Sequence, residues 1–384
     1  METTESQFPT FEEKQQLLLE GQELEVPERT EDFDHSKFPP MKNSLILDSI
    51  QGKSIPRIPV WAMRQAGRYL PEFKEARAGI PFFEFCHMPE KCCEVTLQPL
   101  RKLDFDASII FSDILILPQV MGMNLEYPPG IGPSFTEPIQ EEADLDKLTT
   151  DYGDKLDKTY DAIFLTRHRI NGAVPLFGFT GGPWTLATYM IEGNSPNKCH
   201  KTKRWLYEKP EGFKRLISML TKMIIEHMIN QIKAGAQLVQ LFESNIGELS
   251  QEDFEEFILD PLIEISEKIK EAYPEVPAFI FPRGCHFCYE ALATKSKFDA
   301  ISVDWTHDLS KIRERVGESI TLQGNLEPIV LFGTDEKIKE RTNSMLEKAG
   351  KTKYVANLGW GMLPDHDAEK LRVFIDAVHD FKLE

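Results

Sequence analysis

The chain has 384 residues, of which 41% are hydrophobic and 28% charged, which is the composition of a soluble globular protein with room for one large domain. Its 62 acidic residues outnumber 44 basic ones, and the net charge of −18 disfavours nucleic acid as a partner, while no run of about 18 uncharged apolar residues is available to cross a membrane. The acidic start fits neither a signal peptide nor a transit peptide and the six cysteines are too sparse for a disulfide scaffold, so we expect a cytoplasmic protein with reduced thiols.

The first 40 residues differ in composition from the rest. Residues 1–40 hold eleven acidic and three basic side chains and end at Pro39-Pro40. Because few of these residues are apolar, we expect a flexible, solvated arm that the chemistry does not need. One short helix, around residues 11–19, is predicted within it.

Residues 41–384 alternate short apolar runs with longer segments of helical period. Eight such sheet segments and four clear helices together predict an α/β protein, a single-domain (β/α)8 TIM barrel, with an open doubly wound sheet as the alternative. The predicted strands are 59–63, 107–111, 174–180, 238–244, 278–282, 300–304, 319–325 and 354–359, and the clearest helices are 89–101, 213–233, 254–273 and 367–381.

Polar side chains follow nearly every predicted strand. In a barrel, the carboxyl ends of the strands meet at one mouth, which is where this fold places its chemistry. Three arginines against a single deep carboxylate, Asp113, predict an anionic ligand, because the planar guanidinium fork binds carboxylate or phosphate through two parallel hydrogen bonds. The side chains at or just past the strand ends are Arg64, Arg68, Asp113, Tyr189, Ser244, Arg283, Asp304 and Gln323.

Each of these candidates also has a structural interpretation. The spacing of Arg64 and Arg68 also fits two surface arginines that bridge to helices. Asp113 also fits a buried acid that caps a loop or pairs with an arginine. Tyr189 and Ser244 also fit core hydroxyls that the backbone satisfies. No nucleophilic triad is indicated, because Ser244 has no histidine beside it in the sequence.

One cysteine motif raises the question of a metal. Cys285-His286-Phe287-Cys288 has the spacing of half a zinc site. The sequence offers no second pair of ligands at zinc-site spacing, so we predict no metal.

Several sequence blocks carry a family resemblance. The clearest is PVWAMRQAGRYLPEF at 59–73, and IIFSDILILPQ at 109–119, GFTGGPWTLATYMIEG at 178–193 and TLQGNLEP at 321–328 follow in the same order. Together they resemble the uroporphyrinogen decarboxylase family over residues 42–379, which leaves out the acidic arm. The resemblance implies a homodimer whose two mouths face each other and a decarboxylation that uses no cofactor. The substrate it implies is uroporphyrinogen, a tetrapyrrole whose four acetate side chains become methyl groups in coproporphyrinogen.

The resemblance also implies roles for individual residues. The family's central aspartate, which accepts hydrogen bonds from the pyrrole N–H groups, falls on Asp113, and we expect its charge to stabilise a cationic pyrrole. Its two signature arginines fall on Arg64 and Arg68, and Arg64 is the candidate proton donor. The other substrate-binding positions fall on Gln65, Tyr189 and Ser244.

One substrate-binding position departs from the family. The usual Gly-His-Gly at the end of the last strand reads Gly359-Trp360-Gly361 here. Trp360 is able to stack on a pyrrole or donate its indole N–H to a carboxylate, but it cannot shuttle protons. Two alternatives therefore stay open: a catalytically impaired tetrapyrrole-binding homologue, and a corrinoid-dependent methyltransferase, which would need a zinc site.

Overall fold

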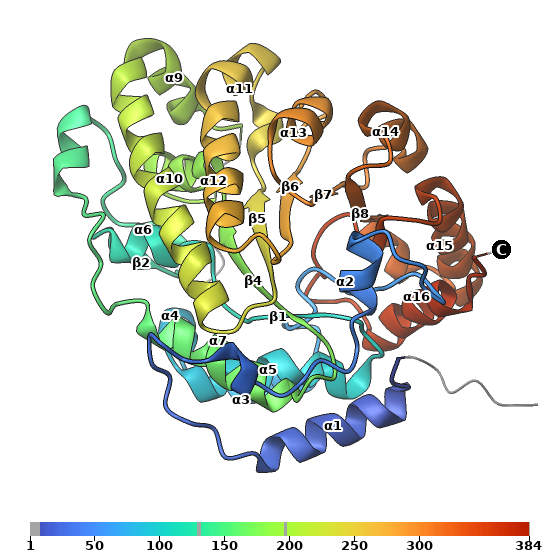
Figure 1. Ribbon diagram of the computed structural model, residues 1–384. Helices are drawn as coiled ribbons and strands as arrows, with labels where there is room; N and C mark the ends of the chain where they lie inside the picture. Colours follow the sequence, from blue (N-terminus) through green and yellow to red (C-terminus); the bar gives the residue numbers. More distant parts are fainter. Residues whose placement is uncertain (1–7, 129–131, 196–197, 384) are drawn as a thin grey trace, which may run out of the picture.

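A computed structural model describes residues 8–128, 132–195 and 198–383. At its centre a curled sheet of seven parallel strands runs in the order β1-β4-β5-β6-β7-β8-β9, with helices around it (Figure 1). All carboxyl ends therefore lie at one rim, and the predicted barrel class is confirmed. The strands are β1 Ser108–Ile109, β4 Leu176–Gly181, β5 Leu238–Glu243, β6 Ala278–Pro282, β7 Ala300–Ser302, β8 Thr321–Leu326 and β9 Tyr354–Leu358.

The first predicted strand is reduced to a single bridge between β9 and the start of β1. Val60 bridges Ala356 in parallel, and its carbonyl accepts the Asp106 N–H at 2.8 Å. Regular pairing stops here because side chains replace strand carbonyls as acceptors. The Val60 N–H goes to the Asp106 carboxylate at 3.0 Å, and the Met63 N–H goes to the Asn357 side chain at 3.0 Å. Seven strands and this segment thus fill the eight predicted positions.

The helices lie outside the sheet and connect successive strands (Figure 1). The α-helices are α1 Phe11–Glu23, α2 Leu45–Ile50, α3 Pro71–Arg77, α4 Phe82–Cys86, α5 Pro89–Lys102, α6 Ile116–Val120, α7 Asp157–Ile170, α8 Pro183–Glu192, α9 His200–Glu208, α10 Pro210–Lys233, α11 Gln251–Phe257, α12 Leu259–Ala272, α13 Tyr289–Lys295, α14 Leu309–Val316, α15 Asp335–Ala349 and α16 Ala368–Asp380. Short 3₁₀ helices are η1 His35–Lys37, η2 Glu142–Lys147, η3 Ile246–Glu248 and η4 Pro328–Phe332.

The predicted helices are present, with one division. The segment 213–233 lies within α10, and 367–381 corresponds to α16, whose first turn is capped by the Asp367 carboxylate. The segment 254–273 is split at Ile258 into α11 and α12. Pro261 accounts for the split, because it has no N–H to donate and its ring collides with the carbonyl one turn earlier.

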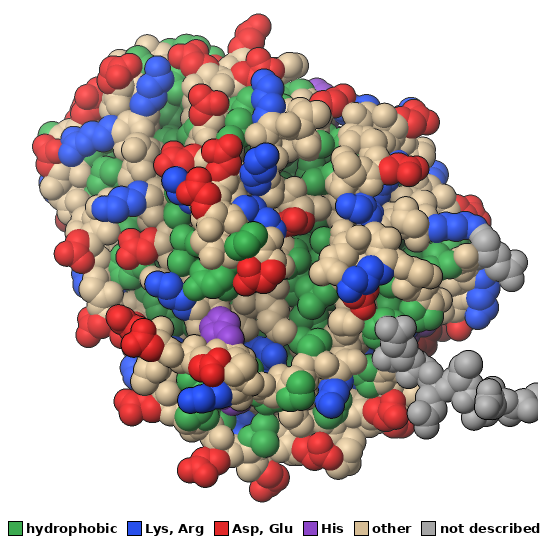
Figure 2. Space-filling view, in the orientation of Figure 1, with side chains coloured by type: hydrophobic (Ala, Val, Ile, Leu, Met, Phe, Trp, Pro, Cys, Tyr) green, Lys and Arg blue, Asp and Glu red, His purple; other side chains and the backbone are tan. Residues whose placement is uncertain are grey.

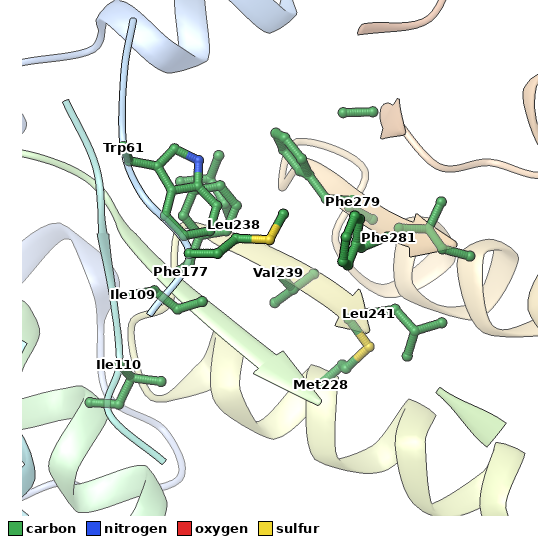
Figure 3. Close-up of a cluster of buried hydrophobic side chains, with 14 of the residues drawn as sticks. Trp61, Ile109, Ile110, Phe177, Met228, Leu238, Val239, Leu241, Phe279 and Phe281 are labelled. Atoms are coloured by element: carbon green, nitrogen blue, oxygen red, sulfur yellow. The ribbon is translucent and has the colours of Figure 1, made fainter. Parts of the chain in front are cut away.

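The interior of the barrel is filled by aromatic side chains around one polar cluster. Trp61 stacks on Phe177 with ring centroids 4.8 Å apart, and both lie among aliphatic side chains of the strands (Figure 3). The Trp61 indole N–H donates to Gln323 at 2.7 Å, and the Gln323 amide donates to Ser302 at 2.8 Å and to Gln240 at 3.1 Å. Gln323, which the sequence placed among the strand-end candidates, is therefore fully buried core and does not reach the mouth.

Residues 8–40 are packed against the barrel, which differs from the expected solvated arm. Helix α1 extends to Glu23, lies along α5 and α7, and buries Lys14, whose ammonium donates to Asp104 at 2.7 Å and to the Phe105 carbonyl at 2.9 Å (Figure 1). The Arg169 guanidinium binds three carbonyls at the end of this helix. Composition misled here because a few apolar side chains, such as Leu18 and Phe38, are buried against the barrel beside these ion pairs and carbonyl contacts.

A short antiparallel hairpin, β2 Leu125–Glu126 with β3 Ser134–Phe135, lies between α6 and α7 in the chain. Acidic side chains are scattered over the face shown in Figure 2, with basic ones between them. Among the described residues, no helix is long and apolar enough to cross a bilayer.

Candidate active site

The mouth of the barrel brings together side chains that follow five different strand positions. Arg64 follows the Val60 segment, Asp113 follows β1, Arg283 follows β6 and Trp360 follows β9. The Arg64 guanidinium interacts electrostatically with Asp113, Arg283 and Tyr189, the last of which lies on α8 after β4. The strand-end pattern thus predicted that Arg64, Asp113, Tyr189 and Arg283 would lie at one mouth, whereas Trp360 became a candidate through the family resemblance.

Asp113 is the half-buried carboxylate of this cluster. The Leu115 N–H donates to Oδ1 at 2.7 Å, and the Tyr127 hydroxyl donates to Oδ2 at 3.0 Å. Burial raises the pKa of Asp113, while the two hydrogen bonds and the positive charge of Arg64 oppose that shift. The site thus holds a carboxylate that is partly desolvated and still has acceptor capacity on both oxygens.

Three guanidinium groups at the mouth form no ion pair with a described residue, although the charges of Asp113 and Asp304 act on Arg64 and Arg283 from beyond ion-pair distance. Among the described residues, no carboxylate forms an ion pair with Arg64, Arg68 or Arg283, whereas Arg57 is paired with Asp106 at 2.6 Å. Enclosure by protein lowers the pKa of Arg64 and of Arg283 from the usual value, but both remain cations at neutral pH. Unpaired cations on a protein of net charge −18 are suited to an anionic ligand.

Trp360 connects two of these arginines. Its ring lies 4.9 Å from the Arg64 guanidinium carbon and 4.4 Å from that of Arg283, both within cation–π distance. On the barrel side it stacks on Phe281 at 5.8 Å with an interplanar angle of 30°. The indole N–H has no partner among the described residues.

Arg64 reaches the mouth through an unusual backbone. Its φ of 60° is in the left-handed region, which a side chain other than glycine rarely adopts. Its aliphatic stem then runs over Gly361, where a Cβ atom would lie 2.4 Å from Arg64 Cδ. Gly361 is therefore required for Arg64 to lie against the end of β9.

Tyr189 lies on α8 and Ser244 directly follows β5, and a buried Glu243 ties these two elements together. The Glu243 carboxylate accepts the N–H groups of Trp184 and Thr185, both at 2.9 Å, in the first turn of α8. Burial raises the pKa of Glu243 to about 7. Ser244 is half-buried directly after β5, and its hydroxyl has no partner among the described residues.

Gln65 and Arg68 differ from the other candidates. The Gln65 side chain is fully buried and bonds the Ala62 N–H at 3.4 Å and the Ala107 carbonyl at 3.3 Å, so its amide ties backbone segments together. Arg68 is exposed and lines an open hollow of about 450 Å³ together with Phe73, Lys74 and Arg77. Gln65 thus holds the backbone beneath the site, and Arg68 lies at the edge of the site.

The sequence analysis did not include Tyr127 among its candidates. It follows the β2 strand of the hairpin and reaches Asp113 through its hydroxyl. Tyr127 does not lie at the end of a barrel strand, because it belongs to a hairpin inserted after β1, so the strand-end pattern does not include it. Its sole signal in the sequence is an aromatic residue in a connection rich in proline and glycine.

Cys285 and Cys288 are buried behind the mouth. The Cys288 thiol donates to the Cys285 carbonyl at 3.1 Å, and burial holds the pKa of Cys288 above its ordinary value. Within the described ranges, no group of three or more His, Cys, Asp or Glu side chains is arranged to hold a metal ion.

Fold and site together define a single-domain α/β barrel whose mouth holds the Asp113 carboxylate and three guanidinium groups that form no ion pair among the described residues. A family model described as uroporphyrinogen decarboxylase matches residues 41–381. The chain is 49% identical over 350 residues to a uroporphyrinogen decarboxylase from Danio rerio, covering 89% of this chain and 95% of that protein. It is 45% identical to that of Homo sapiens, covering 89% of this chain and 95% of the other. The chain belongs to the uroporphyrinogen decarboxylase family.

A solved structure shares the fold at much lower identity. A methyltransferase from Methanosarcina mazei aligns with a TM-score of 0.73 and 20% identity, covering 88% of this chain and 98% of that one. At this identity the likeness concerns the fold alone.

Proposed function

We propose that this chain is a carboxy-lyase that removes CO2 from the four acetate side chains of uroporphyrinogen III and gives coproporphyrinogen III, without a cofactor. The observation that carries the proposal is the carboxylate of Asp113 beside guanidinium groups that form no ion pair among the described residues, in a chain of this family. In uroporphyrinogen III the eight carboxylates match the positive guanidinium groups, and the pyrrole N–H donors match the negative carboxylate of Asp113.

Asp113 is proposed as the catalytic carboxylate. Loss of CO2 from a pyrrole acetate needs an electron sink, which the ring provides after a proton is added to one of its carbons. The C–C bond to the carboxylate then breaks, CO2 leaves, and the electron pair enters the ring. A proton adds to the exocyclic carbon to complete the methyl group, and the ring carbon loses the proton that it gained, so one proton is consumed for each CO2 released. Asp113 stabilises the cationic ring, so its attraction grows toward the transition state.

The arginines are proposed to hold the substrate by its carboxylates. Arg64, whose charge acts on Asp113, is also the proposed proton donor, while Arg68 is proposed to bind a carboxylate at the edge. Tyr189, Ser244 and Trp360 supply further contacts through their hydroxyl and indole groups. For Gln65 the buried amide favours support of Arg64 through the backbone.

The binding homologue without activity stays as a second candidate because of one observation. The Trp360 ring occupies the space between the Arg64 and Arg283 guanidinium groups, where the ring of a substrate would approach. The names of the relatives favour the decarboxylase.

Assembly and location are part of the same proposal. We infer a cytoplasmic homodimer whose mouths face each other, with the packed arm as an accessory to the 41–384 barrel. A dimer is supported by two exposed apolar side chains, Ile329 at 53% and Phe332 at 51%, on η4 directly after β8. Sedimentation of the wild type and of Phe332→Lys tests this, with a monomeric variant expected.

Incubation of the purified protein with uroporphyrinogen III under anaerobic conditions tests the activity. The products are oxidised and separated by their number of carboxylates. Progress from eight carboxylates to four supports the decarboxylase. Substrate that is bound but recovered whole would favour the binding homologue.

A further inference from the structure

Tyr127 reaches the active carboxylate from outside the ring of strands. Its ring packs between α4 side chains, with centroid distances of 4.8 Å to Phe82 and 5.0 Å to Phe83. These contacts fix the ring independently of its hydroxyl. The hydroxyl lies 3.0 Å from Oδ2 of Asp113.

The two hydrogen bonds to Asp113 go to different carboxylate oxygens. The Leu115 N–H occupies one acceptor site on Oδ1, and the Tyr127 hydroxyl occupies one on Oδ2. An ionised carboxylate offers roughly four such sites. One site on each oxygen therefore remains for donors of the substrate, and the plane of the carboxylate is fixed by two donors from opposite ends.

The surroundings keep Tyr127 a hydrogen-bond donor throughout. Burial and the neighbouring Asp113 raise the pKa of the Tyr127 phenol, so it stays protonated at neutral and acidic pH. The other ionisable groups that face Asp113 are Arg64, Tyr189 on α8 and Cys86 on α4. Burial raises the pKa of Tyr189 and of the Cys86 thiol, so both stay neutral in the acidic range.

We propose that Tyr127 is a positioning residue for Asp113, whose hydroxyl orients the carboxylate and keeps it ionised for the pyrrole N–H groups. The role rests on the proposed function, in which Asp113 acts by its charge. The competing interpretation is that Tyr127 is a packing residue of the hairpin whose hydroxyl bonds the nearest acceptor by default.

The variant Tyr127→Phe separates the two, because it keeps the ring against Phe82 and Phe83 and removes only the donor. Tyr152→Phe is the matched control, because the Tyr152 hydroxyl also makes hydrogen bonds within the protein. Its partners are the Tyr160 hydroxyl on α7 at 3.4 Å and the Asn230 amide on α10 at 3.2 Å. For Tyr127→Phe we expect kcat to fall about tenfold and KM to change by less than about threefold.

The pH profile distinguishes positioning from packing. Removing a donor to the charged form disfavours it, so the acid limb of kcat/KM should move to higher pH by about one unit in Tyr127→Phe and stay in place in Tyr152→Phe. A folded Tyr127→Phe protein whose acid limb coincides with that of the wild type would overturn the proposal.

A second measurement does not depend on activity. Carbon-13 NMR of protein labelled at the aspartate carboxyl carbons, assigned by the signal lost in Asp113→Asn, follows the titration of Asp113 without substrate. The titration midpoint should be higher in Tyr127→Phe than in the wild type, and equal midpoints would refute the role of Tyr127. An inactive wild type with the expected difference in midpoints would instead contradict the proposed function.

Discussion

The residues of the mouth are organised by contacts that leave their charges free. Trp360 supports two guanidinium groups through its ring face, where an acidic partner would have neutralised them. A cation on an aromatic ring keeps its N–H edges available, so Arg64 and Arg283 stay open to carboxylates. Trp360 thus gives the mouth a surface that does not titrate and that orients the two arginines.

Trp360→Ala tests this at the residue scale. Each lost cation–π contact is worth about 0.5–2 kcal/mol, so we expect KM to rise about tenfold with kcat reduced by less than about threefold. Trp360→Phe keeps a ring face and should retain most of the affinity. Steady-state kinetics of both variants give the comparison. A Trp360→Ala protein more active than the wild type would mean that the indole blocks the reacting ring.

At the scale of elements, the arm is connected to the site through one buried carboxylate. The Asp106 carboxylate binds Lys14 of α1 at 3.2 Å, Arg57 at 2.6 Å and the Val60 N–H at 3.0 Å. Val60 begins the segment that closes the barrel and leads into Arg64. Helix α1 therefore helps to fix the segment from which the first arginine of the mouth extends.

Lys14→Met should destabilise the protein by about 3 kcal/mol at pH 7, because it leaves buried carboxylate charge less compensated. Burial opposes ionisation of Asp106, but the charges of Arg57 and Lys14 outweigh it and hold the pKa of Asp106 well below its ordinary value. The stabilisation of the folded protein by the ionised Asp106 is fully present above the ordinary carboxyl pKa of about 4. It is lost as the pH falls through the lower pKa that Asp106 has in the folded protein.

Urea unfolding at several pH values checks this prediction. The gap between wild type and Lys14→Met should narrow below about pH 4, where the Asp106 carboxyl of the variant is protonated first. Lys268→Met is the control, since Lys268 on α12 is half exposed and pairs with Glu271 on the surface. A loss no larger than that of the control would show that the buried ion pair does not hold the arm.

The elements also show how far the sequence predicts the structure. The segments of α10 and β6 were predicted nearly to the residue, α10 because its apolar residues recur with the helical period and β6 because its short apolar run is buried on both faces. The segment 59–63 was predicted as a strand from its apolar residues, but the carboxylate of Asp106 and the amide of Asn357 capture its N–H groups. Contacts between residues far apart in the chain, including that of Tyr127, leave no periodic signal.

At the scale of the whole molecule, the net negative charge repels the expected anionic ligand everywhere except at the mouth. The net charge of −18 repels a polycarboxylate, while the unpaired arginines attract it locally. These two effects respond to salt with opposite signs, because screening of the general repulsion lowers KM and screening of the arginine contacts raises it.

We expect the local contacts to dominate. KM for uroporphyrinogen should rise about tenfold between roughly 0.05 and 0.5 M salt, over which the screening length falls several-fold, with kcat within about twofold. Initial rates at a series of salt concentrations, with neutral sucrose at matched viscosity as the control, measure this. A KM that falls with salt would mean that the mouth does not concentrate enough positive charge to bind the substrate.

The most direct measurement of the central claim is the turnover of Asp113→Asn beside the wild type, with substrate binding measured on the same samples. The amide keeps the size of the side chain and removes its charge, so turnover should fall by about 10²–10³ or more while the protein still binds uroporphyrinogen. A folded Asp113→Asn protein that decarboxylates within tenfold of the wild type would contradict the account.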